Sequence, residues 1–288
     1  MSVVPAWRLT DRTLDLQRPI GAGIVNVTED SMFEGARSGT PRQAIADGLE
    51  LAEAGFEMLD VGAVAARSGP PVPAKEEAER LVPAIVGLVE RTELPISADT
   101  FSAEVARGAL DAGAVAINDI AGGSEAMLEL AAETGCGLVV MQIEGPPRED
   151  RDPPRYDDPV DHLKNWFSGR LETATKRGVD EEQIALDPGL GFDLSVADDL
   201  EVLRRLAELK ELGRPLYVSL SRKDFLGAVL AGSWEERVPA TEREWATAAA
   251  VALAVTAGAD VLRLHDMSAL QAMRIAAAID APRGVEVG

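Results

Sequence analysis

Eight short apolar runs, each ending in a polar residue that can form hydrogen bonds, constrain the fold of this chain more than any other feature of its sequence. Between them lie amphipathic stretches rich in Ala, Leu and Glu, with the period of an α-helix. Strand followed by helix, repeated eight times, is the pattern of an α/β fold of the (β/α)8, or TIM, barrel type. The runs end at Asn26, Asp60, Asp99, Asn118, Gln142, Asp187, Ser219 and Arg263.

The residues between the runs agree with this fold. Six glycines each close a helical stretch, in the left-handed position that ends many helices: Gly55, Gly113, Gly135, Gly178, Gly213 and Gly258. Helices are predicted near residues 41–54, 74–91, 101–112, 124–134, 158–177, 196–211, 241–257 and 266–279. Because one barrel needs roughly 250 residues, we expect a single domain over residues 1–288. Residues 1–18 alternate like a short hairpin, which we expect to close the N-terminal end of the barrel.

Charge and composition exclude several classes of partner. The chain has 28 basic and 49 acidic residues, a net charge of −21 that repels nucleic acid and anionic lipid. An anionic substrate would therefore need a local basic cluster. The single Cys136 cannot form an intramolecular disulfide, which favours a reducing cytoplasm. We expect no signal peptide and no membrane segment, since no run approaches the roughly 20 apolar residues that span a bilayer.

The polar strand ends predict a binding pocket, because all parallel strands of a barrel point their carboxyl ends at one mouth. Asp99, Asn118 and Asp187 combine acceptors with an amide that both donates and accepts. Together they suit a flat heterocycle with N–H, amino and carbonyl groups along one edge. Lys223 and Arg263 add positively charged donors. One such residue could simply cap a strand or helix, but five around one mouth favour an enzyme pocket.

A second group of residues predicts an anion site, since strands 1, 2 and 8 adjoin in a closed barrel. Arg67, Arg263 and His265 would meet a phosphate or diphosphate there. Asn26 would offer a carbonyl oxygen to Mg²⁺, which binds few protein ligands and keeps its waters. His265 could instead be an ordinary buried histidine that holds Asp266. No cluster has zinc-type spacing.

Several segments are specific as a set, and they follow the order of a known family over nearly the whole chain. They are NVTEDS (26–31), DVG with Arg67 and Gly69, ISADT (96–100), INDIAGG (117–123), DPGLGF (187–192), SLSRKDFLG (219–227) and RLHD (263–266). With the N-terminal hairpin, they resemble the dihydropteroate synthase family. The resemblance implies a transferase of folate biosynthesis. Such an enzyme joins 6-hydroxymethyl-7,8-dihydropterin diphosphate to 4-aminobenzoate and releases 7,8-dihydropteroate and diphosphate.

The resemblance also implies roles for the residues at the mouth. The pterin would be held by Asp99, Asn118, Asp187, Lys223 and Arg263, of which Lys223, Asp99 and Arg263 would be catalytic. The diphosphate and Mg²⁺ would be held by Asn26, Arg67, Arg263 and His265. The aminobenzoate would be bordered by Phe192, Lys223, Ser221 and Arg222.

The departures from the family pattern fall in two loops. This chain has NVTEDSMFEGA where the family has NVTPDSFSDGG, and GAVAARSG (62–69) where it has GGESTRPG. The pterin residues are thus matched more fully than the loops that close over the diphosphate. Two alternatives follow: a pterin-binding paralogue without this catalysis, and a domain that presents methyl-tetrahydrofolate to a corrinoid protein. The Ala-rich residues 246–257 have small side chains that would permit close helix packing, and a homodimer is expected.

Overall fold

The computed structural model describes residues 6–27, 39–65, 69, 71–149 and 152–281. Within them, eight parallel strands stand side by side in the order β8-β7-β6-β5-β4-β3-β10-β9. A single parallel bridge between Leu186 and Leu216 joins the two outermost strands, so the sheet closes into a ring. The strands are β3 (Ile20–Asn26), β4 (Met58–Gly62), β5 (Ile96–Asp99), β6 (Ala116–Asp119), β7 (Gly137–Met141), β8 (Ile184–Asp187), β9 (Tyr217–Ser219) and β10 (Val261–Leu264).

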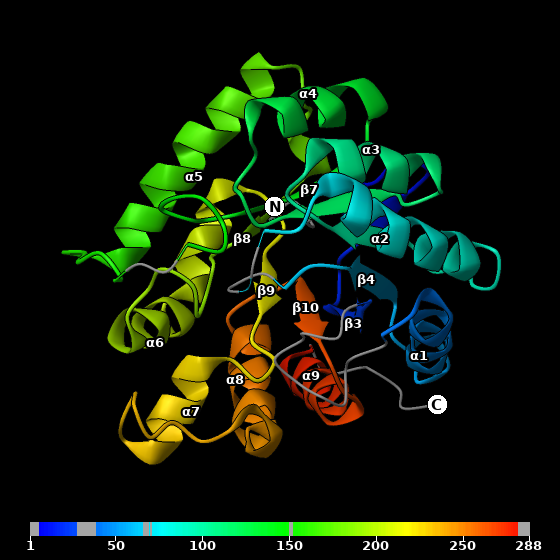
Figure 1. Cartoon of the computed structure of the whole chain (residues 1–288). Coiled ribbons are helices and arrows are strands. Elements are labelled where there is room, and N and C mark those ends of the chain that lie inside the picture. Colours follow the sequence, from blue (N-terminus) through cyan, green and yellow to red (C-terminus); the bar gives the residue numbers. More distant parts are fainter. Residues whose placement is uncertain (1–5, 28–38, 66–68, 70, 150–151, 282–288) are drawn as a thin grey trace.

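Helices surround this ring, as Figure 1 shows. They cover the strands because each turns an apolar face inward, and residues such as Leu81, Ile85 and Leu88 of α2 are fully buried. The helices are α1 (Pro41–Glu53), α2 (Ala74–Val89), α3 (Ala103–Asp111), α4 (Glu125–Thr134), α5 (Pro159–Lys176), α6 (Val196–Arg204), α7 (Asp224–Ala231), α8 (Glu244–Thr256) and α9 (Met267–Asp280). The predicted (β/α)8 barrel is therefore confirmed.

The N-terminal hairpin lies at the end of the barrel where the strands begin. β1 (Ala6–Arg8) pairs in antiparallel fashion with β2 (Thr13–Asp15). The fully buried Trp7 donates a hydrogen bond of 2.7 Å to the carbonyl oxygen of Gln183, directly before β8. Its ring meets that of Tyr217, at the start of β9, edge to face with centroids 6.2 Å apart. Closure of the barrel bottom by this hairpin is thus confirmed over residues 6–18, while residues 1–5 of the predicted hairpin lie outside the described residues.

The structure corrects several of the predicted elements. The helix predicted over 196–211 ends at Arg204, and a 3-10 segment follows over Leu206–Leu212. The helix α7 was not predicted, because DFLGAVLA is short and mostly apolar and so lacks the polar face that marks a surface helix. The second strand was predicted to end at Asp60, yet β4 continues to Gly62. Asp60 therefore lies within the strand, fully buried. The six helix-closing glycines were predicted correctly, since all of them have positive φ.

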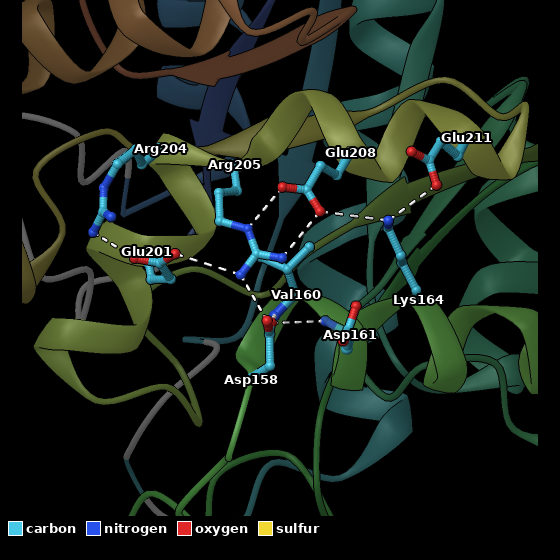
Figure 2. A network of polar contacts seen from close by, with 9 residues as sticks. All are labelled: Asp158, Val160, Asp161, Lys164, Glu201, Arg204, Arg205, Glu208 and Glu211. Carbon is cyan, nitrogen blue, oxygen red and sulfur yellow. Dashed lines mark hydrogen bonds and ion pairs between the residues drawn. The ribbon is translucent and has the colours of Figure 1, made fainter.

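A surface network of charged side chains joins α5 to α6 and to the 3-10 segment η3 (Leu206–Leu212), as Figure 2 shows. Arg205 donates to Asp158 at 2.7 Å and to Glu208 at 2.7 and 3.0 Å. Asp158 also caps α5, since its Oδ1 accepts from the backbone N–H groups of Val160 and Asp161. One carboxylate thereby starts the helix and ties it to its neighbour.

No described helix has both the length and the apolar character needed to cross a lipid bilayer.

Candidate active site at the barrel mouth

Arg263 of β10 connects the polar side chains at the carboxyl end of the barrel. Its Nε donates to Asp60 Oδ2 at 2.5 Å, and its Nη2 donates to Asp99 Oδ2 at 2.6 Å. The same Asp60 oxygen accepts from Asn118 Nδ2 at 3.1 Å. The hydroxyl of Ser97 donates to the other oxygen of Asp60. Side chains from β4, β5, β6 and β10 are thus held in one buried network.

Asp60 is the site residue to which sequence reasoning gave no role. Its side chain is fully buried and accepts hydrogen bonds from three neighbours, whereas Arg263 is 15% exposed. A buried carboxylate of this kind is tolerated only when it is paired and hydrogen-bonded. The signal was present in the sequence, because Asp60 follows an apolar run. Its partner, however, lies 203 residues further along the chain.

The predicted pterin residues contain acceptors that are shielded from water. Oδ1 of Asn118 is buried and has no hydrogen-bond partner among the described residues. Asp187 accepts from the backbone N–H of Gly189 at 2.9 Å, and burial raises the pKa of its carboxyl to about 6. Burial also raises the pKa of Asp99; the charge of Arg263 opposes this shift and that of Asp60 adds to it. A ligand with several N–H groups would satisfy such acceptors.

Lys223 and Phe192 lie together at the same mouth. The Lys223 ammonium is 4.1 Å from the centroid of the Phe192 ring, a cation–π contact. A Cβ on Gly191 would lie 3.0 Å from Lys223 Cδ, and Gly191 has a φ of 74°, so a side chain there would crowd the lysine and strain the backbone. The charge of Lys223 also lowers the pKa of Asp187 in part, which places the two side chains in one electrostatic neighbourhood.

Ser221, Arg222 and His265 form a third group beside β10. His265 Nδ1 lies 2.8 Å from the hydroxyl of Ser221. Burial, with the nearby charges of Arg263 and Arg222, lowers the pKa of His265 to about 3, so the imidazole is neutral at pH 7. Arg222 donates to Asp266 at 2.8 Å and to the carbonyl oxygen of Ala240 at 2.9 Å.

Most of the residues predicted for this site therefore share one mouth. Asn26 is the last residue of β3, in register with Gly62 of β4, which is in register with Asp99 of β5. Arg67 lies outside the described residues. No group of three His, Cys, Asp or Glu side chains suited to a metal ion occurs in the described part of the chain.

Three comparisons with known proteins, two of sequence and one of structure, found relatives of this chain. A family model described as "Pterin binding enzyme" matches residues 22–265. The dihydropteroate synthase of Synechocystis sp. is 38% identical over 251 residues, which cover 86% of this chain and 85% of that protein. The solved dihydropteroate synthase of Xanthomonas albilineans with 4-aminobenzoic acid has a TM-score of 0.85 at 38% identity, covering 96% of this chain and 99% of that one. The same enzyme in complex with 7,8-dihydropteroate has a TM-score of 0.81 at 36% identity, with the same coverage.

Proposed function

This chain belongs to the pterin-binding enzymes and, among them, to the dihydropteroate synthase family of transferases, and we propose for it the following reaction. It joins 6-hydroxymethyl-7,8-dihydropterin diphosphate to 4-aminobenzoate, in folate biosynthesis. The observation that carries this proposal is the buried network of Asp60, Asp99, Asn118 and Arg263 at the mouth. Such a network holds polar groups rigidly where a nitrogen heterocycle can meet them.

The pterin is recognised along its polar edge. The carboxylate of Asp187 accepts hydrogen bonds from ring N–H and amino groups, and the orphaned Asn118 Oδ1 accepts another. Lys223 donates to the ring carbonyl. Arg263 cannot turn freely, because its guanidinium is held by two carboxylates. The pocket is therefore preorganised, and little ordering is needed when the substrate binds.

Condensation is proposed to depend on electrostatics more than on a strong base. The bond between the pterin methylene carbon and the diphosphate oxygen breaks, and the aniline nitrogen forms a new bond to that carbon. Positive charge develops on the pterin while the leaving group keeps the electron pair. Asp60 and Asp99 supply negative charge near the ring, in a site largely shielded from water. Lys223, in contact with Phe192, is proposed to border the aminobenzoate together with Ser221 and Arg222.

The leaving diphosphate is assigned to the side of β3 and β10. The neutral imidazole of His265 offers one ring N–H, and Arg67 is proposed to add a guanidinium. Asn26 fits Mg²⁺ in the chemistry of its donor, because this hard ion prefers oxygen and is often held by one or two protein ligands plus phosphate and water. Bound Mg²⁺ would supply positive charge to the departing diphosphate. Asn26 is the protein ligand that we propose, since the described residues contain no group of three His, Cys, Asp or Glu side chains that could hold the ion.

A single assay tests the proposed reaction. Purified protein is given the pterin diphosphate and Mg²⁺, with and without 4-aminobenzoate, and released diphosphate is measured. We expect release that depends on aminobenzoate. A protein that binds pterin in calorimetry but never condenses aminobenzoate would be a re-purposed paralogue instead.

Lys223→Ala provides the matched test at residue level. Loss of the ammonium should lower kcat/KM by at least about 100-fold, the range seen when one electrostatic catalytic donor is removed. Circular dichroism should show an intact barrel, since the lysine lies at the mouth and not in the core. Wild-type-like turnover would remove Lys223 from the mechanism.

We also propose that the chain forms one domain and a homodimer, and that it works in the cytoplasm. Support for the dimer comes from the adjacent helices α8 and α9, which expose Trp245, Leu253, Ile275 and Ile279 to 61% or more. We call these four residues the α8–α9 apolar surface. The reducing compartment is supported by Cys136, a buried free cysteine.

A further inference from the structure

Arg148, a residue to which neither the sequence pattern nor the proposed mechanism gives a role, reaches the mouth from the loop between β7 and α5. Its backbone has φ of 68°, in the left-handed region. For a residue with a side chain this conformation costs about 1 kcal/mol. Among the described residues, only one other non-glycine residue has positive φ, and it is Arg222 at the same mouth. Backbone strain of this kind is often kept where it aims a functional side chain.

The guanidinium of Arg148 lies over the β4–α2 side of the mouth, away from its own strand. A Cβ on Gly69 would be 2.6 Å from Arg148 Nη2, so the arginine occupies the space that a side chain there would need. Its Nε and Nη1 atoms are buried. Its charge also lowers the pKa of Glu77, a 97%-buried carboxyl group on the first turn of α2 whose pKa is raised chiefly by burial. The side chain of Arg148 therefore extends from the loop after β7 to Gly69, in the loop after β4.

The diphosphate is assigned to the side of β3 and β10, and β4 is the strand next to β3. Gly62, from which the β4–α2 loop departs, is in register with Asn26 on one side and with Asp99 on the other. The carboxylates nearby are unfavourable to an anion. The charge of Glu77, for example, repels that of Asp99 and raises the pKa of its carboxyl group. Arg263 already serves two carboxylates and Arg222 serves Asp266. A further cation beside Arg67 and Mg²⁺ would therefore favour a diphosphate at this rim, where the net charge of the described side chains is unfavourable to an anion.

We propose that Arg148 is a further substrate-binding residue, which holds the diphosphate of the pterin substrate and discriminates for it against pterins without that group. This inference rests on the proposed function. A guanidinium suits the task because its planar donors can grip phosphate oxygens in pairs. The negative charge of Glu77, with which Arg148 interacts electrostatically, favours this position of the guanidinium before the substrate arrives.

The test compares two ligands, the pterin diphosphate and the same 6-hydroxymethyl-7,8-dihydropterin without diphosphate, by calorimetry with Mg²⁺. Arg148→Ala should weaken the diphosphate ligand at least about ten-fold, the size expected for a charge-assisted hydrogen bond, and change the other ligand less than about two-fold. Arg148→Gly should do the same without backbone strain, because glycine accepts a positive φ. Arg148→Lys should fall between, since it keeps the charge and loses the paired donors.

Arg155, an exposed arginine of the same loop, gives the matched control. Arg155→Ala should bind both ligands like the wild type. Equal loss of both ligands in Arg148→Ala and Arg148→Gly, or no loss of either, would overturn the assignment while leaving the proposed function in place. A wild-type protein that binds neither ligand would overturn the proposed function and this inference with it.

Discussion

At the scale of single residues, the charge state of the mouth is set by which carboxylates Arg263 neutralises. It pairs with Asp60 and Asp99 at 2.5 and 2.6 Å, while Asp187 lies in the same field without pairing directly with it. The two paired carboxylates fix the arginine. Asp187 keeps an acceptor for the ligand. The same kind of side chain thus has a structural role in one place and a binding role in another, and its neighbours decide which.

Asp60→Asn tests the structural role. Replacing the carboxylate removes one of the two charges that compensate the buried Arg263, which should lower the free energy of unfolding by about 3 kcal/mol. Urea denaturation followed by circular dichroism measures this. The control is Glu133→Gln, which breaks an exposed ion pair with Arg107 and should leave the urea midpoint unchanged. Equal midpoints for wild type and Asp60→Asn would show that Asp60 is dispensable for the network.

The pH dependence of pterin binding tests Asp187. Burial holds its pKa at about 6, so the carboxylate that accepts ligand N–H groups is lost as the pH falls through 6. Affinity should then drop about ten-fold per pH unit below that point. Folding stability should respond with the opposite sign, because a raised carboxyl pKa in the folded state stabilises it at low pH and this contribution is lost as the pH rises through 6. Calorimetry at pH 5, 6 and 7 measures the affinity, and Asp187→Asn should bind more weakly at pH 7 with a smaller slope.

At the scale of helices and strands, sequence patterns predicted most of the barrel because period and punctuation are local properties. An α-helix occurs at each of the eight predicted positions, although the one predicted over 196–211 ends at Arg204 and is followed by a 3-10 segment. The six helix-closing glycines have the expected conformation. What remained hidden depends on partners far away in the chain. Asp60 pairs with Arg263 of β10, two strands away around the barrel and 203 residues further along the chain. Arg148 reaches the mouth through a backbone conformation that no local pattern marks.

The candidate site was predictable to a similar degree. Asp99, Asn118 and Arg263 do converge, because strand ends of a barrel share one mouth. The sequence could not show which side-chain donors are already hydrogen-bonded within the protein. Two donors of Arg263 serve carboxylates, and Arg222 holds Asp266 and Ala240, so their roles toward substrates depend on tertiary contacts.

The network in Figure 2 yields a prediction about α5, whose first turn follows the long β7–α5 loop. Asp158→Ala removes both the helix cap and the ion pair with Arg205 and should lower the melting temperature. Asp158→Asn keeps a capping oxygen and should fall between that variant and the wild type. The difference between wild type and Asp158→Asn should shrink in 1 M salt, roughly as screening shortens the range of the ion pair. Identical melting of both variants would mean that the cap contributes nothing.

At the scale of the whole molecule, a net charge of −21 and an apolar surface coexist. Repulsion between copies favours monomers, so association needs a surface that buries enough apolar area to exceed it. The α8–α9 apolar surface is the candidate, and it lies on the outside of the barrel in helices that follow β9 and β10. The mouth stays open to substrate in such an arrangement, because the helices flank the barrel wall.

Leu253 and Ile275 test this arrangement, since they are 61% and 63% exposed on neighbouring helices and take little part in the core. The double variant Leu253→Glu, Ile275→Glu places two more negative charges on each copy of that surface. Burial of unpaired carboxylates in an apolar interface costs several kcal/mol, so the dimer should dissociate while each barrel stays folded.

Sedimentation velocity should show the wild type as a dimer and this variant as a monomer. Added salt should strengthen the wild-type dimer, because it screens the repulsion between the two negatively charged copies. The control is Val229→Glu on α7, outside the α8–α9 apolar surface and 49% exposed, which should sediment like the wild type. A wild-type protein that stays monomeric at high concentration, or a double variant that remains dimeric, would show that these two helices do not form the contact.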